Sequence, residues 1–373
     1  MSFSWLTPTP MQVWAVEPGA MQITWGFLPR GQLTVRVNRD HPISLVHEGG
    51  PGSVALESLS PGPKEIEITS VRGTFRLSTS IPERPGGEEL CRIATISDLH
   101  LGSGNWGALR TIRDNDPGHR DHYDMRCASY AINEAIDWGA SLLIIKGDSA
   151  HHRRERDFAL VGQLVDRFPR LPMILIPGNH DVDRTHPIDI PLSVGKRGLR
   201  MERGVVTHDF PGVRVIAADT TIEFKGTGTM KHVEEQILTE AADSPTQNLI
   251  ALHHQFQEHP VATYWPPGIS RREGKRFLAG LNRAAPNSLV TSGHTHRNRS
   301  RRSGSVLVTE VGSTKDWPGV WGGYRVFDGG IYQTVRRVAA PSAIAWTEYS
   351  RRALLGLWSG WSPGTIEDRC VAL

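Results

Sequence analysis

The chain has 373 residues, of which 38% are hydrophobic and 22% charged, a composition that is ordinary for globular proteins and unlike that of disordered chains. The formal net charge of +3 permits an anionic substrate but does not indicate a nucleic-acid-binding surface. The three cysteines are scattered and odd in number, so no disulfide framework is expected. Because the N-terminus lacks a signal-peptide pattern and no apolar run approaches a membrane span, we expect a soluble, cytoplasmic protein.

Short strand-like runs separated by turn sequences fill the first part of the chain. The runs MQVWAV, MQITWGF, LTVRV, KEIEITSV and TFRLSTS alternate with turns such as GGPG and SPGP. This spacing predicts a small β-sandwich over residues 1–88, and the segment ALESLSPGPKEIEIT resembles a strand-turn-strand unit of fibronectin type III domains. The segment IPERPGGEEL, residues 81–90, has the proline, glycine and charge of a linker.

From Cys91 onward, apolar strand-like runs alternate with helix-like segments. The strand-like runs are RIATIS, SLLIIKGD, MILIPGNHD, VRVIAAD, NLIALHH and NSLVTSGHTH. The helix-like segments are RCASYAINEAIDW, ERDFALVGQLVDRF, KHVEEQILTEAAD and RREGKRFLAGLNRA. This alternation predicts an α/β domain with buried sheets over residues 89–340. Residues 341–373 are predicted to be a tail that packs on this domain, in which residues 342–361 can form an amphipathic helix; a partner or membrane surface is its alternative target.

Polar side chains follow five of these strand-like runs, at the point where each run ends. In chain order they are Asp98 and His100, Asp148, Asn179 with His180 and Asp181, His253 and His254, and His294 and His296. Because ligands bind outside the carboxyl ends of strands in open α/β sheets, we expect these side chains to converge. A single Asp-x-His pair also suits a helix cap beside a surface histidine. Five strand ends that offer oxygen and imidazole donors instead predict a divalent-metal site.

The series D-x-H, G-D, G-N-H-D, H-H and G-H-T-H resembles the motif order of the calcineurin-like metallophosphoesterase superfamily, over roughly residues 91 to 340. The resemblance implies a four-layer α/β/β/α sandwich with a two-metal site at one edge. By motif position it implies Asp148 as a bridging ligand between two sets: Asp98, His100 and His296 for the first metal, and Asn179, His253 and His294 for the second. Mixed oxygen and nitrogen donors without cysteine suit manganese, iron or zinc rather than magnesium alone.

The resemblance also implies roles for residues beside the metals. His180 is implied to lie beside the phosphate and to give a proton or hydrogen bond to the leaving oxygen, and Asp181 is a candidate for orienting it. His151 stands where purple acid phosphatases carry a tyrosine ligand, so a charge-transfer iron(III) site is not expected.

Several further residues stay open. His254 either packs behind the site or contacts substrate, and four other histidines are candidates for reaching the pocket: His119, His122, His151 and His152. The arginine clusters are by default solvated faces. Arg297 directly follows the last two ligand positions, so it is a candidate for contact with a phosphate or purine.

The G-N-H-D, LHH and G-H-T-H blocks look most similar to those of class III cyclic-nucleotide phosphodiesterases. The resemblance implies a dinuclear-metal phosphoesterase that cleaves a phosphodiester, with a cyclic nucleotide as one candidate, by attack of a metal-bridging hydroxide. The alternatives are a phosphomonoesterase, a hydrolase of nucleotide or lipid pyrophosphates, and an inactive scaffold. All seven ligand positions and His180 are filled, which disfavours the scaffold. The expected partner is a small phosphoester substrate; the sequence contains no clear nucleic-acid or membrane signal and does not indicate the oligomeric state.

Overall fold

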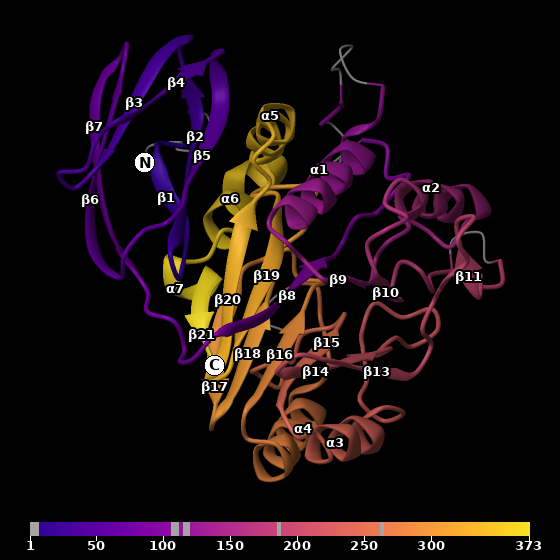
Figure 1. Cartoon of the computed structure of the whole chain (residues 1–373). Helices are drawn as coiled ribbons and strands as arrows, with labels where there is room; N and C mark the ends of the chain where they lie inside the picture. The colour runs from indigo at the N-terminus through magenta and orange to yellow at the C-terminus, as the bar shows by residue number, and fades with distance from the viewer. Residues whose placement is uncertain (1–6, 106–111, 115–119, 185–187, 262–264) are drawn as a thin grey trace.

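Two six-stranded sheets form the centre of the computed structural model, which describes residues 7–105, 112–114, 120–184, 188–261 and 265–373 (Figure 1). The first sheet consists, in spatial order, of β10 (Met173–Ile176), β9 (Leu142–Lys146), β8 (Glu89–Ile96), β19 (Val320–Phe327), β20 (Gly330–Arg337) and β21 (Cys370–Ala372). The second consists of β13 (Val205–Phe210), β14 (Val213–Ala218), β15 (Gln247–Leu252), β16 (Ser288–Ser292), β18 (Val306–Glu310) and β17 (Arg299–Ser303).

The strands that precede the predicted ligands are parallel and almost completely buried. In the first sheet β8, β9 and β10 run parallel, and in the second β14, β15, β16 and β18 do. Side chains from both sheets, among them Ile144, Ile176 and Leu249, share one hydrophobic core. A strand that is buried on both faces has a continuous run of apolar residues, and for this reason these strands could be predicted from the sequence.

Four helices cover the outer faces of the two sheets. Helices α1 (Tyr123–Asp137) and α2 (Glu155–Asp166) share a core with the first sheet, and α3 (Glu234–Ala242) and α4 (Arg271–Ala284) share one with the second. The two pairs lie on opposite sides of the sheets (Figure 1). Each helix falls within or overlaps a predicted helix-like segment, and the predicted mixed α/β class is confirmed.

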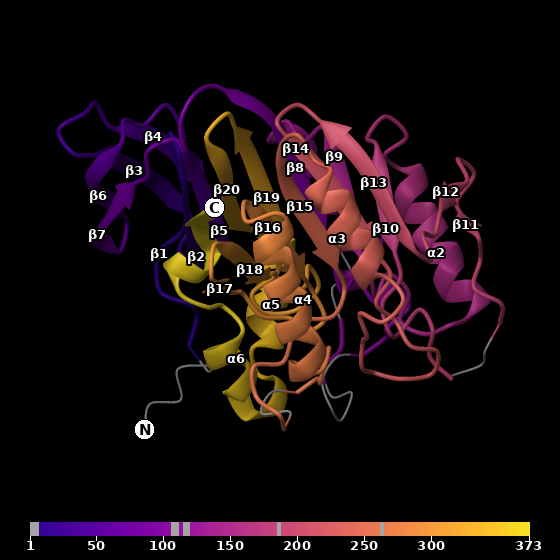
Figure 2. The same ribbon diagram turned by 90° about the horizontal axis from the view of Figure 1, so that it is seen from below.

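The N-terminal part is built from strands in two sheets with a shared core that includes Trp25, Leu33 and Ile68. One sheet contains β1 (Gln12–Glu17), β2 (Ala20–Leu28) and β5 (Gly50–Leu56); the other contains β4 (Ile43–His47), β3 (Gly31–Val37), β6 (Gly62–Ser70) and β7 (Gly73–Ile81). Strands β4 and β5 were not predicted from the sequence; the first residues of β5, Gly50–Gly52, were interpreted as part of the turn GGPG. Both views place these strands at the end of the molecule opposite α2 (Figures 1 and 2).

The N-terminal strands contact the edge of the first sheet through buried polar contacts. The indole of Trp14 is fully buried and donates a hydrogen bond to the carbonyl of Val335 (3.2 Å). Gln22 donates to the carbonyl of Arg337 (2.8 Å) and accepts from its backbone N–H (2.9 Å). These contacts involve β20 rather than the strand ends that carry the predicted ligands.

The C-terminal segment differs from the single helix predicted over residues 342–361. It consists of α5 (Pro341–Ser350), a 3-10 turn (Ala353–Gly356), α6 (Leu357–Trp361) and α7 (Ile366–Arg369), followed by β21 at the edge of the first sheet. Gly356 adopts a left-handed conformation with φ of 82°, which breaks the helical path before α6. Leu354 is one of the apolar residues within the predicted helix, and its side chain is not among those that the structure describes. A small hairpin of β11 (Ser193–Val194) and β12 (Leu199–Arg200) completes the fold.

Within the described parts of the chain, no helix combines the length and apolarity needed to cross a membrane.

An ion-pair cluster at the start of β8 predicts a pH-dependent contribution to stability. Although burial alone would raise it, hydrogen bonds from Arg325 and Arg92 lower the pKa of Glu89 to about 2. A carboxyl whose folded pKa is depressed stabilises the fold above its unfolded pKa and loses that contribution as the pH falls toward the folded value. Glu89→Gln should therefore lower the free energy of unfolding at pH 7 by about 1–2 kcal/mol, a figure reduced for partial solvent exposure.

The measurement is denaturant unfolding of both proteins between pH 7 and pH 3. The difference between them should narrow as the pH falls below about 4.5, the ordinary value for glutamate. If the difference in free energy of unfolding between the two proteins stays constant over this pH range, the charge of Glu89 does not contribute to stability.

Candidate metal centre

The side chains that follow the five strands meet at one place, with Asp148 at its centre. The Oδ1 of Asp148 lies 3.4 Å from Nε2 of His253, and its Oδ2 lies 3.6 Å from Nε2 of His100. The same nitrogen of His100 lies 3.4 Å from Nε2 of His296, which is 3.5 Å from Oδ1 of Asp98. Asp148 thus lies between two groups of donor atoms.

The second group surrounds His253. Its Nε2 lies 3.2 Å from Oδ1 of Asn179, and its ring centroid is 5.0 Å from that of His294. The backbone N–H of His294 donates to both oxygens of Asp98, at 3.1 and 3.0 Å, which ties the end of β16 to the end of β8. All seven predicted ligands therefore belong to one cluster.

Hydrogen bonds on the far side of three imidazoles fix which ring nitrogen faces the cluster. His253 donates from Nδ1 to the carbonyl of Lys146 (2.8 Å), and His294 donates from Nε2 to the carbonyl of Pro267 (3.3 Å). Nδ1 of His296 lies 2.6 Å from the carboxylate of Asp316. Each ring keeps its other nitrogen for the cluster, which is the arrangement that metal-bound histidines usually show.

Backbone strain is concentrated at the same residues. Five of the predicted ligands have left-handed φ angles between 46° and 67°: Asp98, His100, Asp148, His294 and His296. This conformation costs roughly 1–3 kcal/mol for a residue with a side chain and persists where function or packing demands it. The neighbouring glycines are equally constrained, because a Cβ on Gly178 would lie 2.3 Å from Asp148 and one on Gly293 would lie 2.7 Å from Asp98.

The protonation states favour a bound cation. Burial lowers the pKa of His294 to about 3 and holds the pKa of His100 well below its ordinary value. Burial opposes ionisation of Asp148, but the facing imidazoles of His253 and His180 hold the pKa of this carboxyl well below its ordinary value. Burial also opposes protonation of His253, but the Asp148 carboxylate outweighs it and raises the pKa to about 9. The neutral imidazoles of His100 and His294 beside the ionised Asp148 offer lone pairs and negative charge together, whereas a metal ion would have to displace the proton of His253.

The donor set fits a pair of divalent transition-metal ions. Among the described residues, five groups of side chains have donor atoms within 4.8 Å of one another. Three of them are Asp98, His100 and His296; Asp98, Asp148 and His253; and His253, His254 and His294. The other two are His100, His151 and His180, and His152, His180 and Asp183. Imidazole and carboxylate donors without thiolate suit manganese, iron or zinc.

A pocket of about 620 Å³ opens over the cluster. Its walls include five of the predicted ligands, together with His151, His180 and Lys315. His180 donates from Nδ1 to the carbonyl of His151 (2.8 Å), and its backbone N–H donates to Oδ1 of Asp148 (2.8 Å). These two bonds hold the imidazole at the pocket wall, next to the cluster and open to a ligand.

Asp181 supports the loops rather than the imidazole of His180. Its carboxylate accepts hydrogen bonds from the hydroxyl of Ser149 (2.9 Å) and from the backbone of Ala150 (2.9 Å) and Gly178 (2.8 Å). Burial and the neighbouring Asp148 raise the pKa of Asp181 to about 6. The expectation that Asp181 orients His180 is therefore corrected, because the partner of the His180 ring is the carbonyl of His151.

Of the histidines whose role the sequence left open, one lines the pocket and others do not. His151 lines the pocket, with Nδ1 3.5 Å from Nδ1 of His100, whereas His152 pairs with Asp183 (2.6 Å). His254 is fully buried behind the ligands, where Nδ1 lies 2.9 Å from the hydroxyl of Thr220, and it does not line the pocket.

Of the two histidines in the loop before α1, His122 pairs with Asp124 (3.0 Å) and His119 lies outside the described residues.

Sequence reasoning missed Lys315 and Asp316, which lie in the loop between β18 and β19. Lys315 is 1% exposed and lines the pocket, with Nζ 3.8 Å from the carboxylate of Asp316. Burial lowers the pKa of Lys315. No apolar strand pattern ends at these residues, and only the fold brings them beside His100 and His296.

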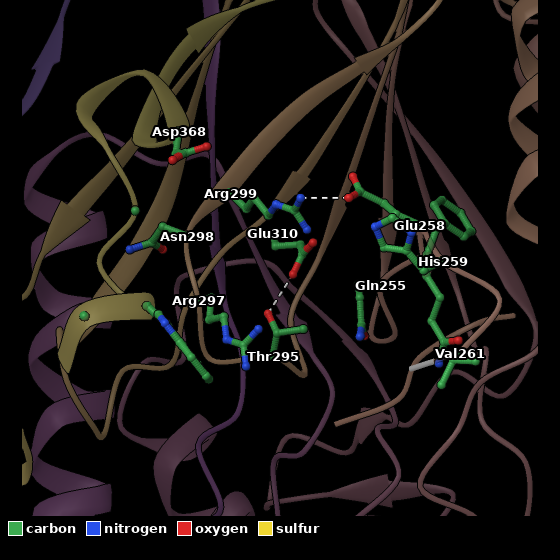
Figure 3. A pocket seen from close by; sticks show the side chains of 15 residues that line it. Gln255, Glu258, His259, Val261, Thr295, Arg297, Asn298, Arg299, Glu310 and Asp368 are labelled. Carbon is green, nitrogen blue, oxygen red and sulfur yellow. Dashed lines mark hydrogen bonds and ion pairs between the residues drawn. The ribbon is translucent and has the colours of Figure 1, made fainter. Parts of the chain in front are cut away.

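Arg297 lies in a neighbouring pocket of about 360 Å³ rather than in the pocket over the cluster (Figure 3). Its guanidinium donates to the backbone carbonyl of Trp265 (2.9 Å). The contact between Arg297 and a phosphate at the cluster that the sequence suggested is therefore not supported by this geometry.

A comparison with protein families identifies the family of this chain. Residues 91–298, more than half of the chain, match the calcineurin-like phosphoesterase family, and the chain belongs to that family. The match spans every strand end that contributes to the cluster. No curated protein matches the chain significantly in sequence.

Several solved structures are similar to this chain at low identity. Purple acid phosphatase PPD1 from yellow lupin (Lupinus luteus) is 12% identical, with 90% of this chain and 73% of that chain covered and a TM-score of 0.46. The protein TT1561 of Thermus thermophilus is 15% identical, with coverages of 67% and 99% and a TM-score of 0.41. Phosphopantetheinyl hydrolase from Mycobacterium tuberculosis is 15% identical, with coverages of 60% and 90% and a TM-score of 0.34. The family assignment rests on the sequence match.

Proposed function

We propose that this member of the calcineurin-like phosphoesterase family is a metal-dependent hydrolase that cleaves a phosphodiester at the cluster around Asp148. The observation that carries the proposal is the convergence of seven oxygen and nitrogen donors in one cluster, five of which line one pocket and five of which are on strained backbone. The proposed ligands of the first ion are Asp98, His100 and His296, those of the second are Asn179, His253 and His294, and Asp148 contacts both.

The chain's own side chains supply the remaining requirements of the reaction. When bound, two metal ions polarise the phosphoryl oxygens and lower the pKa of a water molecule that acts as nucleophile. His180 stands at the pocket wall with Nδ1 engaged by the carbonyl of His151, which leaves Nε2 to face a bound ester. We assign to His180 the transfer of a proton to the leaving oxygen, a role suited to imidazole near neutral pH.

The charge of the pocket bears on the choice of substrate. A phosphomonoester carries about −1.5 to −2 charges at neutral pH, whereas a diester carries only one. Most polar side chains of the pocket wall are histidines and asparagines, which favours the diester. One observation favours a second candidate, a phosphomonoesterase: Lys315 adds a buried cation to the same wall.

The test compares three substrates on one manganese-loaded preparation: bis(p-nitrophenyl) phosphate, p-nitrophenyl phosphate and a cyclic mononucleotide. We expect a higher kcat/KM for bis(p-nitrophenyl) phosphate than for the monoester, and measurable opening of the cyclic nucleotide. Chelation should abolish all three activities. A clear monoester preference without turnover of either diester would replace the diesterase with the phosphomonoesterase.

The finer architecture is also part of the proposal. We infer that the two central sheets and their flanking helices form the four-layer α/β/β/α sandwich of residues 89–340, which the separate cores on each side of the sheets support. We assign a supporting role to the N-terminal β-sandwich of residues 1–88, because its hydrogen bonds reach β20 and Trp14 packs against Trp317, and neither contact involves a proposed ligand. The class III cyclic-nucleotide subgroup stays a hypothesis based on motif similarity.

A further inference from the structure

Two tryptophans from distant parts of the chain line the mouth of the metal pocket. Trp265 follows the strand that supplies His253 and is 79% exposed, although its side chain is large and apolar. Trp358 comes from α6 and packs edge-to-face against the ligand His296, with ring centroids 6.1 Å apart. Exposing a tryptophan to solvent forgoes a large gain from burial, so a residue of this kind beside a site is a candidate for ligand contact.

Arg297 connects the two tryptophan segments. Its guanidinium donates to the backbone carbonyl of Trp265 (2.9 Å) and lies over the ring of Trp358, 5.5 Å from the centroid. It lies equally far from the ring of Trp361, the other tryptophan of α6, which lines only the neighbouring pocket. Arg297 thereby holds α6 against the turn that carries Trp265, and its position directly after His296 fixes both relative to the metal ligands.

The neighbouring pocket offers a weaker case for ligand binding. Two of its carboxylates are already paired within the wall: Glu258 accepts from Arg299 (2.8 Å) and Glu310 accepts from the hydroxyl of Thr295 (2.8 Å), as Figure 3 shows. Side chains that are already paired offer less to a ligand than the aromatic rings of Trp265 and Trp358 in the metal pocket.

The composition of the metal pocket distinguishes a planar polar ligand from an acyl chain. Among the described residues of its wall, the apolar side chains are aromatic rings, proline rings and one alanine: Trp265, Pro266, Pro267, Ala353 and Trp358. The wall also contains three short polar side chains: Ser103, Asn105 and Thr227. An acyl chain would be expected to meet leucine, isoleucine, valine or methionine, whereas flat rings beside hydrogen-bonding groups suit a heterocycle with polar edges.

We propose, on the basis of the phosphoester hydrolase function above, that Trp265 and Trp358 form a subsite that stacks a nucleobase of the substrate beside the metal centre. The substrate class is then a nucleoside phosphodiester, cyclic or linear. The tryptophans act as specificity residues, and Arg297 is a positioning residue that acts through them.

The test uses two esters with the same leaving group, thymidine 5′-monophosphate p-nitrophenyl ester and methyl p-nitrophenyl phosphate, on the manganese-loaded full chain. The wild type should show a kcat/KM on the order of 10-fold or more higher for the thymidine ester, the scale of a single base stacked on an aromatic ring. Trp265→Leu and Trp358→Leu should each reduce this preference severalfold, mainly through a lower kcat/KM for the thymidine ester. Trp361→Leu is the matched control and should keep the preference.

Other outcomes would overturn the inference. Equal kcat/KM for the two esters, or a preference that survives both substitutions, would show that the tryptophans do not select the base. A stronger preference for decyl p-nitrophenyl phosphate would indicate an apolar chain instead. Metal content is measured for Trp358→Leu because the ring of Trp358 contacts His296. Trp265 does not have this contact, so Trp265→Leu tests the subsite without altering the surroundings of that ligand.

A binding measurement separates this inference from the proposed function. If neither ester is hydrolysed by the metal-loaded protein, the phosphodiesterase proposal fails. Calorimetric titration still compares thymidine 5′-monophosphate with ribose 5-phosphate. Tighter binding of the nucleotide that is lost in Trp265→Leu supports the subsite, and equal binding of the two ligands contradicts it.

Discussion

Asp148→Ala is expected to lower phosphodiester hydrolysis on the order of 10³-fold or more, beyond the ~10–100-fold typical of changes around a metal ligand's outer contacts. The two oxygens of Asp148 face different imidazoles, His253 at 3.4 Å and His100 at 3.6 Å, so the substitution removes a donor from both proposed ions. It also leaves the backbone N–H of His180 without its acceptor. Metal content should fall together with activity, because each proposed ion then lacks its shared ligand and keeps only three of its four proposed ligands.

The matched control is Asp183→Ala. Asp183 lies near the site but pairs with His152 (2.6 Å) and does not line the pocket. This variant should keep its metal and most of its activity. Elemental analysis and kcat/KM are measured on both variants after their folding has been checked by thermal unfolding. An Asp148→Ala protein with normal activity and metal content would contradict the bridging assignment.

His180→Ala should keep the metal and lose roughly 10²-fold or more in kcat, the usual scale of general acid catalysis. His180 lines the pocket, and its ring donates to a backbone carbonyl rather than to a proposed ligand. The loss should depend on the leaving group, because an alkoxide needs a proton as it departs and p-nitrophenolate does not. The comparison is therefore between a cyclic nucleotide and bis(p-nitrophenyl) phosphate in wild type and variant.

His152→Ala serves as the control for His180, since His152 pairs with Asp183 outside the pocket. Loss of metal from His180→Ala would make this residue a ligand or a support of one. An equal loss of kcat for both leaving groups would indicate phosphate binding in place of proton transfer. An unchanged kcat would remove His180 from the mechanism.

The positions of the proposed ligands could be predicted because each follows an apolar strand whose partners are also buried. Parallel strands bring their carboxyl ends to one edge, so residues as far apart in sequence as Asp98 and His296 reach the same place. The left-handed backbone at five of them was not predictable, since neither aspartate nor histidine requires it.

Other features depend on contacts that no local pattern records. Lys315 and Asp316 reach the site from a loop, and Asp316 contacts His296 from outside any predicted strand. Strand β17 was interpreted as an arginine cluster, because its side chains are polar; two of them, Arg299 and Arg301, pair with Glu258 instead. The break in the predicted C-terminal helix follows from the left-handed Gly356, which the apolar periodicity does not reveal.

If the cluster around Asp148 holds two catalytic metal ions, a stoichiometric metal titration should count both of them. Chelator-treated full-length protein is titrated with manganese while bound metal and hydrolysis of bis(p-nitrophenyl) phosphate are followed together. Activity should rise to a plateau at two equivalents of metal per chain, and Asp148→Ala should show neither the binding nor the rise. Full hydrolysis by the metal-free protein, or no metal bound at this cluster, would contradict the two-metal centre.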